Sequence, residues 1–390
     1  MKRILVLLLI SPMLLPASAR AADGGQVMAI RAGRIVTVAG GAIENGVVLV
    51  RGGKIEDVGK DLQVPGDAQV IDASKQTVVP GFIDAQSHLG LSLDALSEID
   101  ETVQPIAAEM QVIDAFDPAA DALARAVRCG VTAVMLAPGS RNPVGGQTAV
   151  VKLSGGSPDR WLVRQTAGVK LSVAGDVLMH DRKPTSMPGL IAMLRERLDS
   201  AKSYTAANKF DPSTEVLSRV VQRAIPAYIQ AQTVDEVSTA INLIAQYGLQ
   251  AAITGGDQAD ELVEMLVERK VAVIYGPLLL YSKDKDLKRP AKLAGAGVKL
   301  AFSSCSPRTC AGDIRTSAIL AVRYGLSRDE AMKALTLNAA EILGLADRLG
   351  SIQKGRDADL VIFDADPLEA SSRVETVIID GKVVYQRERT

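Results

Sequence analysis

The chain has 390 residues, of which 47% are hydrophobic and only 3% aromatic, and its 44 Lys and Arg residues nearly balance its 45 Asp and Glu residues. This composition predicts a folded protein with a large aliphatic core and excludes a disordered chain. The balanced charge provides no general attraction to nucleic acid or to an anionic membrane surface, so we expect neither as a partner.

The N-terminal segment has the pattern of a secretory signal peptide. Lys2 and Arg3 precede an apolar run over residues 4–15, and the small residues 17–19 provide a cleavage site. The run is too short for a comfortable membrane span and contains Pro12. We therefore assign residues 1–22 to a signal peptide and predict a secreted protein with no membrane span after cleavage, most simply in a bacterial periplasm.

Both ends of the remaining chain have the pattern of β structure. Residues 27–79 alternate short β-branched runs with glycine turns and show no helical periodicity. Residues 345–390 have the same character, and Asp380-Gly381 is a two-residue hairpin signal. Neither segment is large enough to fold alone, so we predict that the two join in one small composite β-sandwich.

The middle of the chain, residues 80–344, alternates apolar strand patterns with helical patterns. The predicted strands are Phe82–Ala85, Thr132–Leu136, Ala149–Leu153, Gly168–Val173, Ala227–Gln230, Gln250–Thr254, Val271–Tyr275 and Val298–Phe302. Eight such strands separated by helices predict an α/β fold, a (β/α)8 TIM-like barrel. A doubly wound open sheet is the alternative, although no glycine-rich dinucleotide fingerprint supports it.

The first predicted strand ends in polar residues. After the apolar residues 79–83 come Asp84, Gln86, Ser87 and His88. Alternation along a strand places Gln86 and His88 on the same face. Because active sites of (β/α)8 barrels form at the carboxyl ends of the strands, this stretch marks the expected mouth of the barrel.

Four motifs give the chain a resemblance to the amidohydrolase superfamily, within its imidazolonepropionase-like group. They are residues 79–88, 138–147, 335–344 and 349–364. The resemblance covers essentially the whole mature chain and implies a metal-dependent-hydrolase barrel with a composite β-sandwich. It also implies hydrolysis of a non-peptide carbon–nitrogen bond by water activated on one or two metal ions, which are held by histidines and carboxylates.

On the first and fourth strands the family's ligand positions are partly kept. Gln86 stands where the first histidine of a pair is expected, and His88 matches the second. Asp176 occupies the position of the strand-four acid. Lys170 lies on the strand that supplies a bridging lysine in some relatives, and we interpret it as a structural or pocket-lining residue.

On the later strands the family's ligands are missing. Gln230 and Gln232 lie where a histidine is expected on strand five, and Gly255 has no side chain at the strand-six position. Cys305 replaces the strand-eight aspartate, which in the family also carries the proton of the attacking water. In an oxidising compartment Cys305 and Cys310, five residues apart, are candidates for a disulfide.

These replacements predict a degenerate site, in which His88 and Asp176 are the residual ligands. We expect no cofactor, with Zn²⁺ as the metal to consider if one binds. The predicted function is that of an exported amidohydrolase-family protein, catalytically impaired, which binds a small molecule or acts as a subunit in a homo-oligomer or beside an active paralogue. The alternatives are an active amidohydrolase with a one-metal site of His88, Asp176 and Cys305, and a periplasmic solute-binding module.

Overall fold

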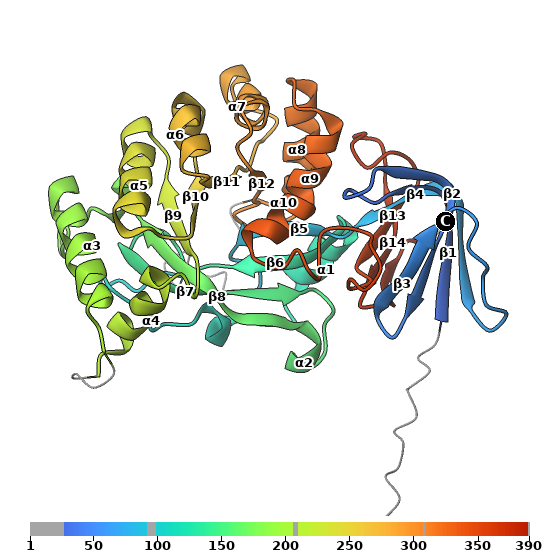
Figure 1. Cartoon of the computed structure of the whole chain (residues 1–390), viewed down its shortest axis with the longest axis horizontal. Coiled ribbons are helices and arrows are strands. Elements are labelled where there is room, and N and C mark those ends of the chain that lie inside the picture. The colour runs from blue at the N-terminus through green and yellow to red at the C-terminus, as the bar shows by residue number, and fades with distance from the viewer. Residues whose placement is uncertain (1–26, 92–98, 206–209, 307–308, 389–390) are drawn as a thin grey trace, which may run out of the picture.

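The computed structural model describes residues 27–91, 99–205, 210–306 and 309–388, and it contains a barrel with a separate β-sheet beside it (Figure 1). The predicted signal peptide, residues 1–22, lies outside the described residues. Among the described residues, no helix combines the length and the apolar character needed to cross a membrane.

The separate sheet has seven strands and is built from both ends of the chain. Its order is β15 (Lys382–Gln386), β14 (Val374–Ile379), β13 (Leu360–Phe363), β4 (Gln69–Pro80), β1 (Val27–Val36), β2 (Ala42–Arg51) and β3 (Lys54–Gly59). The two ends meet where β13 pairs antiparallel with β4, with Val361 opposite Val79. The Asp380-Gly381 turn joins β14 to β15 with positive φ at both residues, as a type I′ hairpin requires. The prediction that the two ends join in one domain is confirmed.

The barrel sheet has eight strands, which follow one another in chain order. They are β5 (Phe82–Ser87), β6 (Val131–Leu136), β7 (Val144–Lys152), β8 (Leu162–Ser172), β9 (Ala227–Ala231), β10 (Ala251–Gly255), β11 (Ala272–Tyr275) and β12 (Leu300–Phe302). The last strand, β12, packs against the first, β5, so the sheet is nearly closed. The predicted TIM-like barrel is confirmed.

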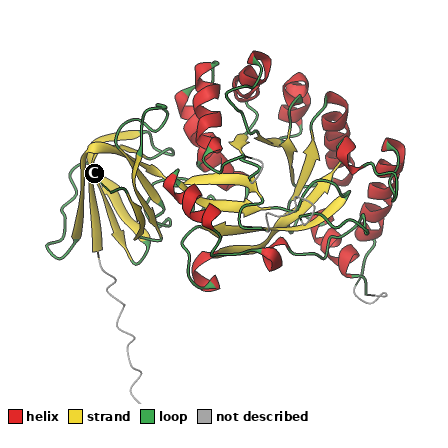
Figure 2. Cartoon of the chain, turned by 180° about the vertical axis from the view of Figure 1, so that it is seen from behind, coloured by secondary structure: helices red, strands yellow, loops and turns green. Residues whose placement is uncertain are grey.

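Helices cover the outside of the barrel (Figure 2). They are α1 (Asp121–Arg128), α2 (Pro158–Trp161), α3 (Met187–Lys202), α4 (Pro212–Val221), α5 (Val234–Tyr247), α6 (Val263–Glu268), α7 (Asp284–Gly295), α8 (Asp313–Arg323), α9 (Arg328–Leu335) and α10 (Leu337–Ile342), with 3-10 turns η1 (Val112–Ala115), η2 (Gly175–Val177) and η3 (Ala259–Leu262). Each longer helix turns its apolar face inward, and α5 also begins with a capping box formed by Thr233 and Glu236.

One strand departs from the predicted pattern of alternating strands and helices. β7 runs antiparallel to both β6 and β8, whereas the remaining neighbours in this sheet are parallel. The β6–β7 connection is the short segment 137–143, which contains no helix. A parallel strand requires a long crossover, usually a helix, so a short connection returns the chain antiparallel. The expectation of a helix between every pair of strands was therefore wrong at β7.

A buried ionic cluster joins the barrel to the seven-stranded sheet. Lys152, the last residue of β7, is 1% exposed, and its Nζ donates to Asp357 Oδ2 at 2.8 Å and to Asp359 Oδ1 at 3.0 Å. It also donates to Asp380, in the hairpin between β14 and β15. Three carboxylates from the C-terminal segment thus neutralise one barrel lysine.

Candidate functional site

The mouth of the barrel contains a buried lysine held by three neutral oxygen atoms. Lys170, on β8, is 1% exposed. Its Nζ donates to Gln86 Oε1 at 2.9 Å, to Gln230 Oε1 at 3.0 Å and to Thr254 Oγ1 at 2.6 Å. An ammonium group has three hydrogens to donate, so these three acceptors use all of them.

The strands of the barrel bring these four side chains together near their carboxyl ends. Parallel pairing places Ser172 beside Gln230 and Gln230 beside Thr254. Thr254 Oγ1 in turn donates to Gln230 Oε1 at 2.9 Å. We call Lys170, Gln86, Gln230 and Thr254 the lysine cluster. Each strand interior is buried, so the cluster is fixed by regular sheet geometry and not by a loop.

The lysine cluster is unusual because, among the described residues, no carboxylate forms a hydrogen bond or ion pair with the ammonium group. Burial lowers the pKa of Lys170 to about 7, although Cys305 and Asp100 act electrostatically in the opposite direction. Burial also raises the pKa of Asp100, which accepts a hydrogen bond from the Arg141 backbone N–H at 3.1 Å. Lys170 therefore changes charge close to neutral pH, where most lysines remain cations.

Gly255 has no room for a ligand side chain while the lysine cluster is intact. A Cβ at this position would lie 2.6 Å from Gln230 Nε2, and Gly255 has φ +85°, a conformation that favours glycine. Gly255, which stands at the position of the missing strand-six ligand, thus packs directly against Gln230, the glutamine on strand five. A histidine at position 255 would displace the amide that holds Lys170.

His88 and Cys305 lie near Gln86 and connect the first strand to the segment after β12. The backbone N–H of His88 donates to Ser306 O at 2.8 Å, and the N–H of Cys305 donates to Gln86 O at 3.3 Å. The His88 ring places Nδ1 2.6 Å from Ala137 O, a carbonyl that can only accept, so Nδ1 carries the proton. Cys305 has φ +49°, and its Sγ lies 3.5 Å from Ser303 Oγ.

Asp84 braces the same junction. Its Oδ1 accepts from the Ser304 N–H at 3.0 Å, and its Oδ2 accepts from the Ser304 hydroxyl. Burial raises the pKa of Asp84 to about 7, against the opposing effect of the Ser304 bonds. This carboxyl group ties β5 to the end of β12 and so helps to close the barrel.

Two of the expected site residues lie apart from the lysine cluster. Asp176 is exposed on η2, after β8. Gln232, just after β9, lines a polar cavity of about 360 Å³ together with Asp257, Tyr275 and Arg289. This cavity opens where β9, β10 and β11 end, so it belongs to the mouth of the barrel.

The proposed one-metal site of His88, Asp176 and Cys305 is not assembled. In the parts of the chain that the structure describes, no three residues among His, Cys, Asp and Glu are grouped so that they could hold a metal ion. The physical reason is that Asp176 belongs to an exposed turn beyond the strand, while His88 is buried at the junction of β5 and β12. The three residues of this alternative site are therefore not grouped as metal ligands in the described parts of the chain. Cys305 and Cys310 are thiols and do not form the disulfide considered from their spacing.

The donor set at the mouth does not fit a catalytic zinc ion. Zinc requires neutral imidazoles, thiolates or carboxylates, usually three of them together with water. The lysine cluster instead offers two amide oxygens and a hydroxyl, all directed at an ammonium group. A metal ion placed there would meet a positive charge, so we derive no step through a metal.

A nearly closed barrel with polar side chains at its carboxyl ends, carrying an added sheet built from both termini, is the architecture expected for the amidohydrolase superfamily. Comparisons with known proteins agree. Residues 306–385 match the model of the amidohydrolase family. The solved structure of an amidohydrolase from Thermotoga maritima MSB8 is 32% identical, with 92% of this chain and 100% of that chain covered and a TM-score of 0.87. The chain belongs to the amidohydrolase family.

Curated relatives are more distant. An imidazolonepropionase from Acidiphilium cryptum is 28% identical over 84% of this chain and 89% of its own length. The amidohydrolase tasK from Hapsidospora irregularis is 22% identical over 87% of this chain. This chain spans 40% of the length of tasK, which is thus a much longer protein.

Thr254 and Asp100 were missed from the sequence. Thr254 is the next-to-last residue of β10, one residue before Gly255, and a hydroxyl at that point could have been recognised as a partner for a buried lysine. Asp100 lies in an irregular segment far from Lys170 in sequence, and no local pattern indicates their proximity.

Proposed function

We propose that this chain is a member of the amidohydrolase family that binds a small polar molecule at the barrel mouth and does not hydrolyse carbon–nitrogen bonds by the metal-dependent route. One observation carries the proposal. Gln86 and Gln230, two positions at which the family resemblance expects metal-binding histidines, both direct their Oε1 atoms at the Lys170 ammonium.

The replacement is chemically consistent. A histidine that binds metal through its neutral nitrogen would leave the Lys170 ammonium without an acceptor, whereas glutamine supplies an oxygen that accepts a hydrogen bond from it. The ammonium thus provides a positive charge where the family places a cation. Gly255 completes the arrangement because its missing side chain makes room for the Gln230 amide.

The polar cavity lined by Gln232, at the ends of β9, β10 and β11, supports a binding role. It has a volume of about 360 Å³, within the range of small-molecule sites, and is lined by polar side chains that include Gln232 and Arg289. We expect a polar ligand that forms hydrogen bonds with these groups. Export, supported by the signal-peptide pattern of residues 1–22, and association with a second copy or an active relative are further parts of the proposal.

Metal binding and turnover test the proposal together. The purified mature chain is incubated with Zn²⁺ or Mn²⁺, desalted and measured by elemental analysis, and is assayed with N-acyl amino acids and short peptides. We expect the parent chain to retain less than one metal ion per chain and to show no turnover. The amount of retained metal should be the same in His88→Ala. A triple variant with Gln86→His, Gln230→His and Lys170→Met serves as a control that should retain more zinc.

Stoichiometric metal that a chelator removes and that His88→Ala abolishes would overturn the proposal. Turnover lost in the same variant would do so as well. The ligand site is tested separately by adding small polar amides and measuring the melting temperature. Any increase in the melting temperature of the parent chain should be smaller in Gln232→Ala. An unchanged response in Gln232→Ala would place the ligand elsewhere.

A further inference from the structure

Two cysteines from distant parts of the sequence approach each other on the outside of the barrel. Cys129 directly follows α1, and Cys310 lies three residues before α8. Both are thiols in this structure. Neither belongs to the lysine cluster, and the proposed function makes no use of them.

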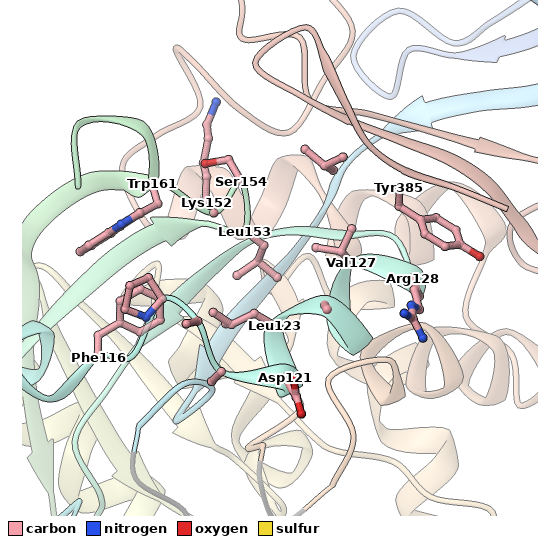
Figure 3. Close-up of a pocket in the computed structure, with 16 residues that line it drawn as sticks. Phe116, Asp121, Leu123, Val127, Arg128, Lys152, Leu153, Ser154, Trp161 and Tyr385 are labelled. Atoms are coloured by element: carbon pink, nitrogen blue, oxygen red, sulfur yellow. The ribbon is translucent and has the colours of Figure 1, made fainter. Parts of the chain in front are cut away.

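The position of Cys129 is fixed by the packing of α1. Leu123 and Val127 of this helix are buried, and they line the same cavity as Leu153, which follows β7 (Figure 3). The Cys129 N–H donates to Ala126 O at 3.0 Å, so the thiol is carried by the last turn of the helix. Cys129 therefore extends from a helix end that the protein core holds in place.

A tight turn brings Cys310 to the same place. The Asp313 N–H donates to Cys310 O at 2.9 Å, and the Cys310 N–H donates to Asp313 Oδ2 at 3.1 Å. Gly312, inside this turn, packs against Cys129, since a Cβ on Gly312 would lie 2.6 Å from Cys129 Sγ. Cys310 is thus two residues from direct contact with the Cys129 thiol, and Gly312 has no side chain to keep the turn away from it.

The two thiols also act on each other electrostatically. Burial raises the pKa of the Cys129 thiol, the Arg315 guanidinium acts in the opposite direction, and Cys310 raises the pKa further. Such an effect requires proximity because the interaction between two charges weakens with their separation. A disulfide needs Cβ atoms about 4 Å apart, and the turn at Gly312 permits this approach.

The third cysteine is directed elsewhere. Cys305 Sγ lies 3.5 Å from Ser303 Oγ and 3.9 Å from Gly276 O, where β11 and β12 end. Its thiol therefore belongs to the barrel mouth, whereas Cys129 and Cys310 lie beside the helices.

We propose that Cys129 and Cys310 form a reversible disulfide when the chain meets a disulfide oxidant such as oxidised glutathione. Cys310 is exposed, so its thiolate attacks one sulfur of the oxidant, forms a mixed disulfide and releases one glutathione thiolate. Cys129 Sγ, after its proton has passed to solvent, attacks Cys310 Sγ and releases the second glutathione. Two protein thiols are oxidised, and one oxidant disulfide is reduced to two thiols.

The bond joins the helix after the first barrel strand to the helix after the last. It lies near Arg315, whose guanidinium donates to Pro367 O at 2.7 Å and to Glu369 O at 2.8 Å, in the segment that leads to β14. A cross-link between positions so far apart in sequence restricts the unfolded chain strongly. We expect the melting temperature of the oxidised chain to be about 2 to 6 °C higher than that of the reduced chain.

The test is a redox titration of the full mature chain. The folded protein is equilibrated in glutathione buffers from fully reduced to fully oxidised, its remaining thiols are blocked with N-ethylmaleimide, and its peptides are identified by mass spectrometry. We expect a linked Cys129–Cys310 peptide to accumulate with oxidation while Cys305 is recovered as the blocked thiol. The rise in melting temperature should follow the amount of linked peptide.

Variants separate the two steps. In Cys129→Ser the reaction should stop at the mixed disulfide of Cys310 with glutathione, and the melting temperature should not rise. Cys305→Ser, the matched control, should form the linked peptide and show the same rise as the parent chain.

Three results would overturn the proposal. The first is recovery of three blocked thiols from the parent chain in fully oxidised buffer. The second is a linked Cys305–Cys310 peptide as the main product. The third is a Cys129–Cys310 peptide that forms only when the chain is unfolded in urea. All three are measured on the parent chain, so they decide the question even if the variants fail to fold.

Discussion

The buried ammonium of Lys170 makes a quantitative prediction about the pH dependence of stability. Its pKa is about 7 in the folded protein, compared with about 10.5 for an exposed lysine. Between these values the unfolded chain binds more protons than the folded chain, so the free energy of unfolding rises with pH. The destabilisation caused by burying Lys170 is absent above pH 10.5, grows as the pH falls from 10.5 to 7, and is complete below pH 7.

The magnitude follows from the two pKa values. Each pH unit between them is worth about 1.4 kcal/mol, so the full effect is on the order of 5 kcal/mol, and the part between pH 6 and pH 9 is between about 2 and 3 kcal/mol. Asp84, with a pKa of about 7, and Asp359, with a pKa of about 6, also titrate, and they act in the opposite direction because their folded pKa values are raised. Both carboxyl groups are present in the parent chain and in Lys170→Met, so subtracting the unfolding free energies of the two proteins removes their effect.

The assay is urea unfolding followed by circular dichroism at pH 6, 7, 8 and 9, for the parent chain, Lys170→Met and the exposed-lysine control Lys288→Met. Lys170→Met leaves Gln86 Oε1 without its donor, which costs about 1 to 3 kcal/mol at every pH. The change with pH is therefore the informative quantity. Parallel curves for the parent chain and Lys170→Met would refute the assignment of a buried lysine that titrates near neutrality.

Two further predictions concern packing. Gly255→Ala should destabilise the protein by about 1 to 3 kcal/mol, because its Cβ would meet the Gln230 amide at a positive φ, and by more than Gly297→Ala, which has φ +90° and open space around it. Equal losses in urea unfolding would show that Gln230 yields freely. Lys152→Met should cost about 3 to 5 kcal/mol because the buried Asp359 carboxylate loses its cation, whereas Lys299→Met, in an exposed pair, should cost under about 1 kcal/mol. Similar losses for the two lysines would contradict the burial of the cluster.

Much of the fold could be predicted because its signals are local. Alternating β-branched runs and the Asp380-Gly381 turn indicate paired strands within a few residues of sequence. The orientation of β7 could not be predicted in this way. An apolar run reads the same in a parallel and an antiparallel strand, and only the short connection 137–143, without a helix, reveals the reversal.

The site was predictable in position but not in arrangement. Polar residues at the ends of apolar strands indicated Gln86 and Gln230, and both lie next to last in their strands, β5 and β9. That both oxygens converge on Lys170 depends on strand spacing around a closed sheet, over separations of 84 and 60 residues. A lysine in a fully buried strand was itself a usable signal, since such a group requires partners.

The buried cluster of Lys152 has a consequence for the order of folding. The carboxylates that neutralise this barrel lysine all come from residues 357–380, near the end of the chain. A nascent chain that lacks this segment has a barrel lysine with no counterion and a β4 edge with no β13 to pair with it. The N-terminal strands and the barrel therefore gain their last contacts only after residues 357–380 have been synthesised. Synthesis of nearly the whole chain thus precedes the last cooperative folding step.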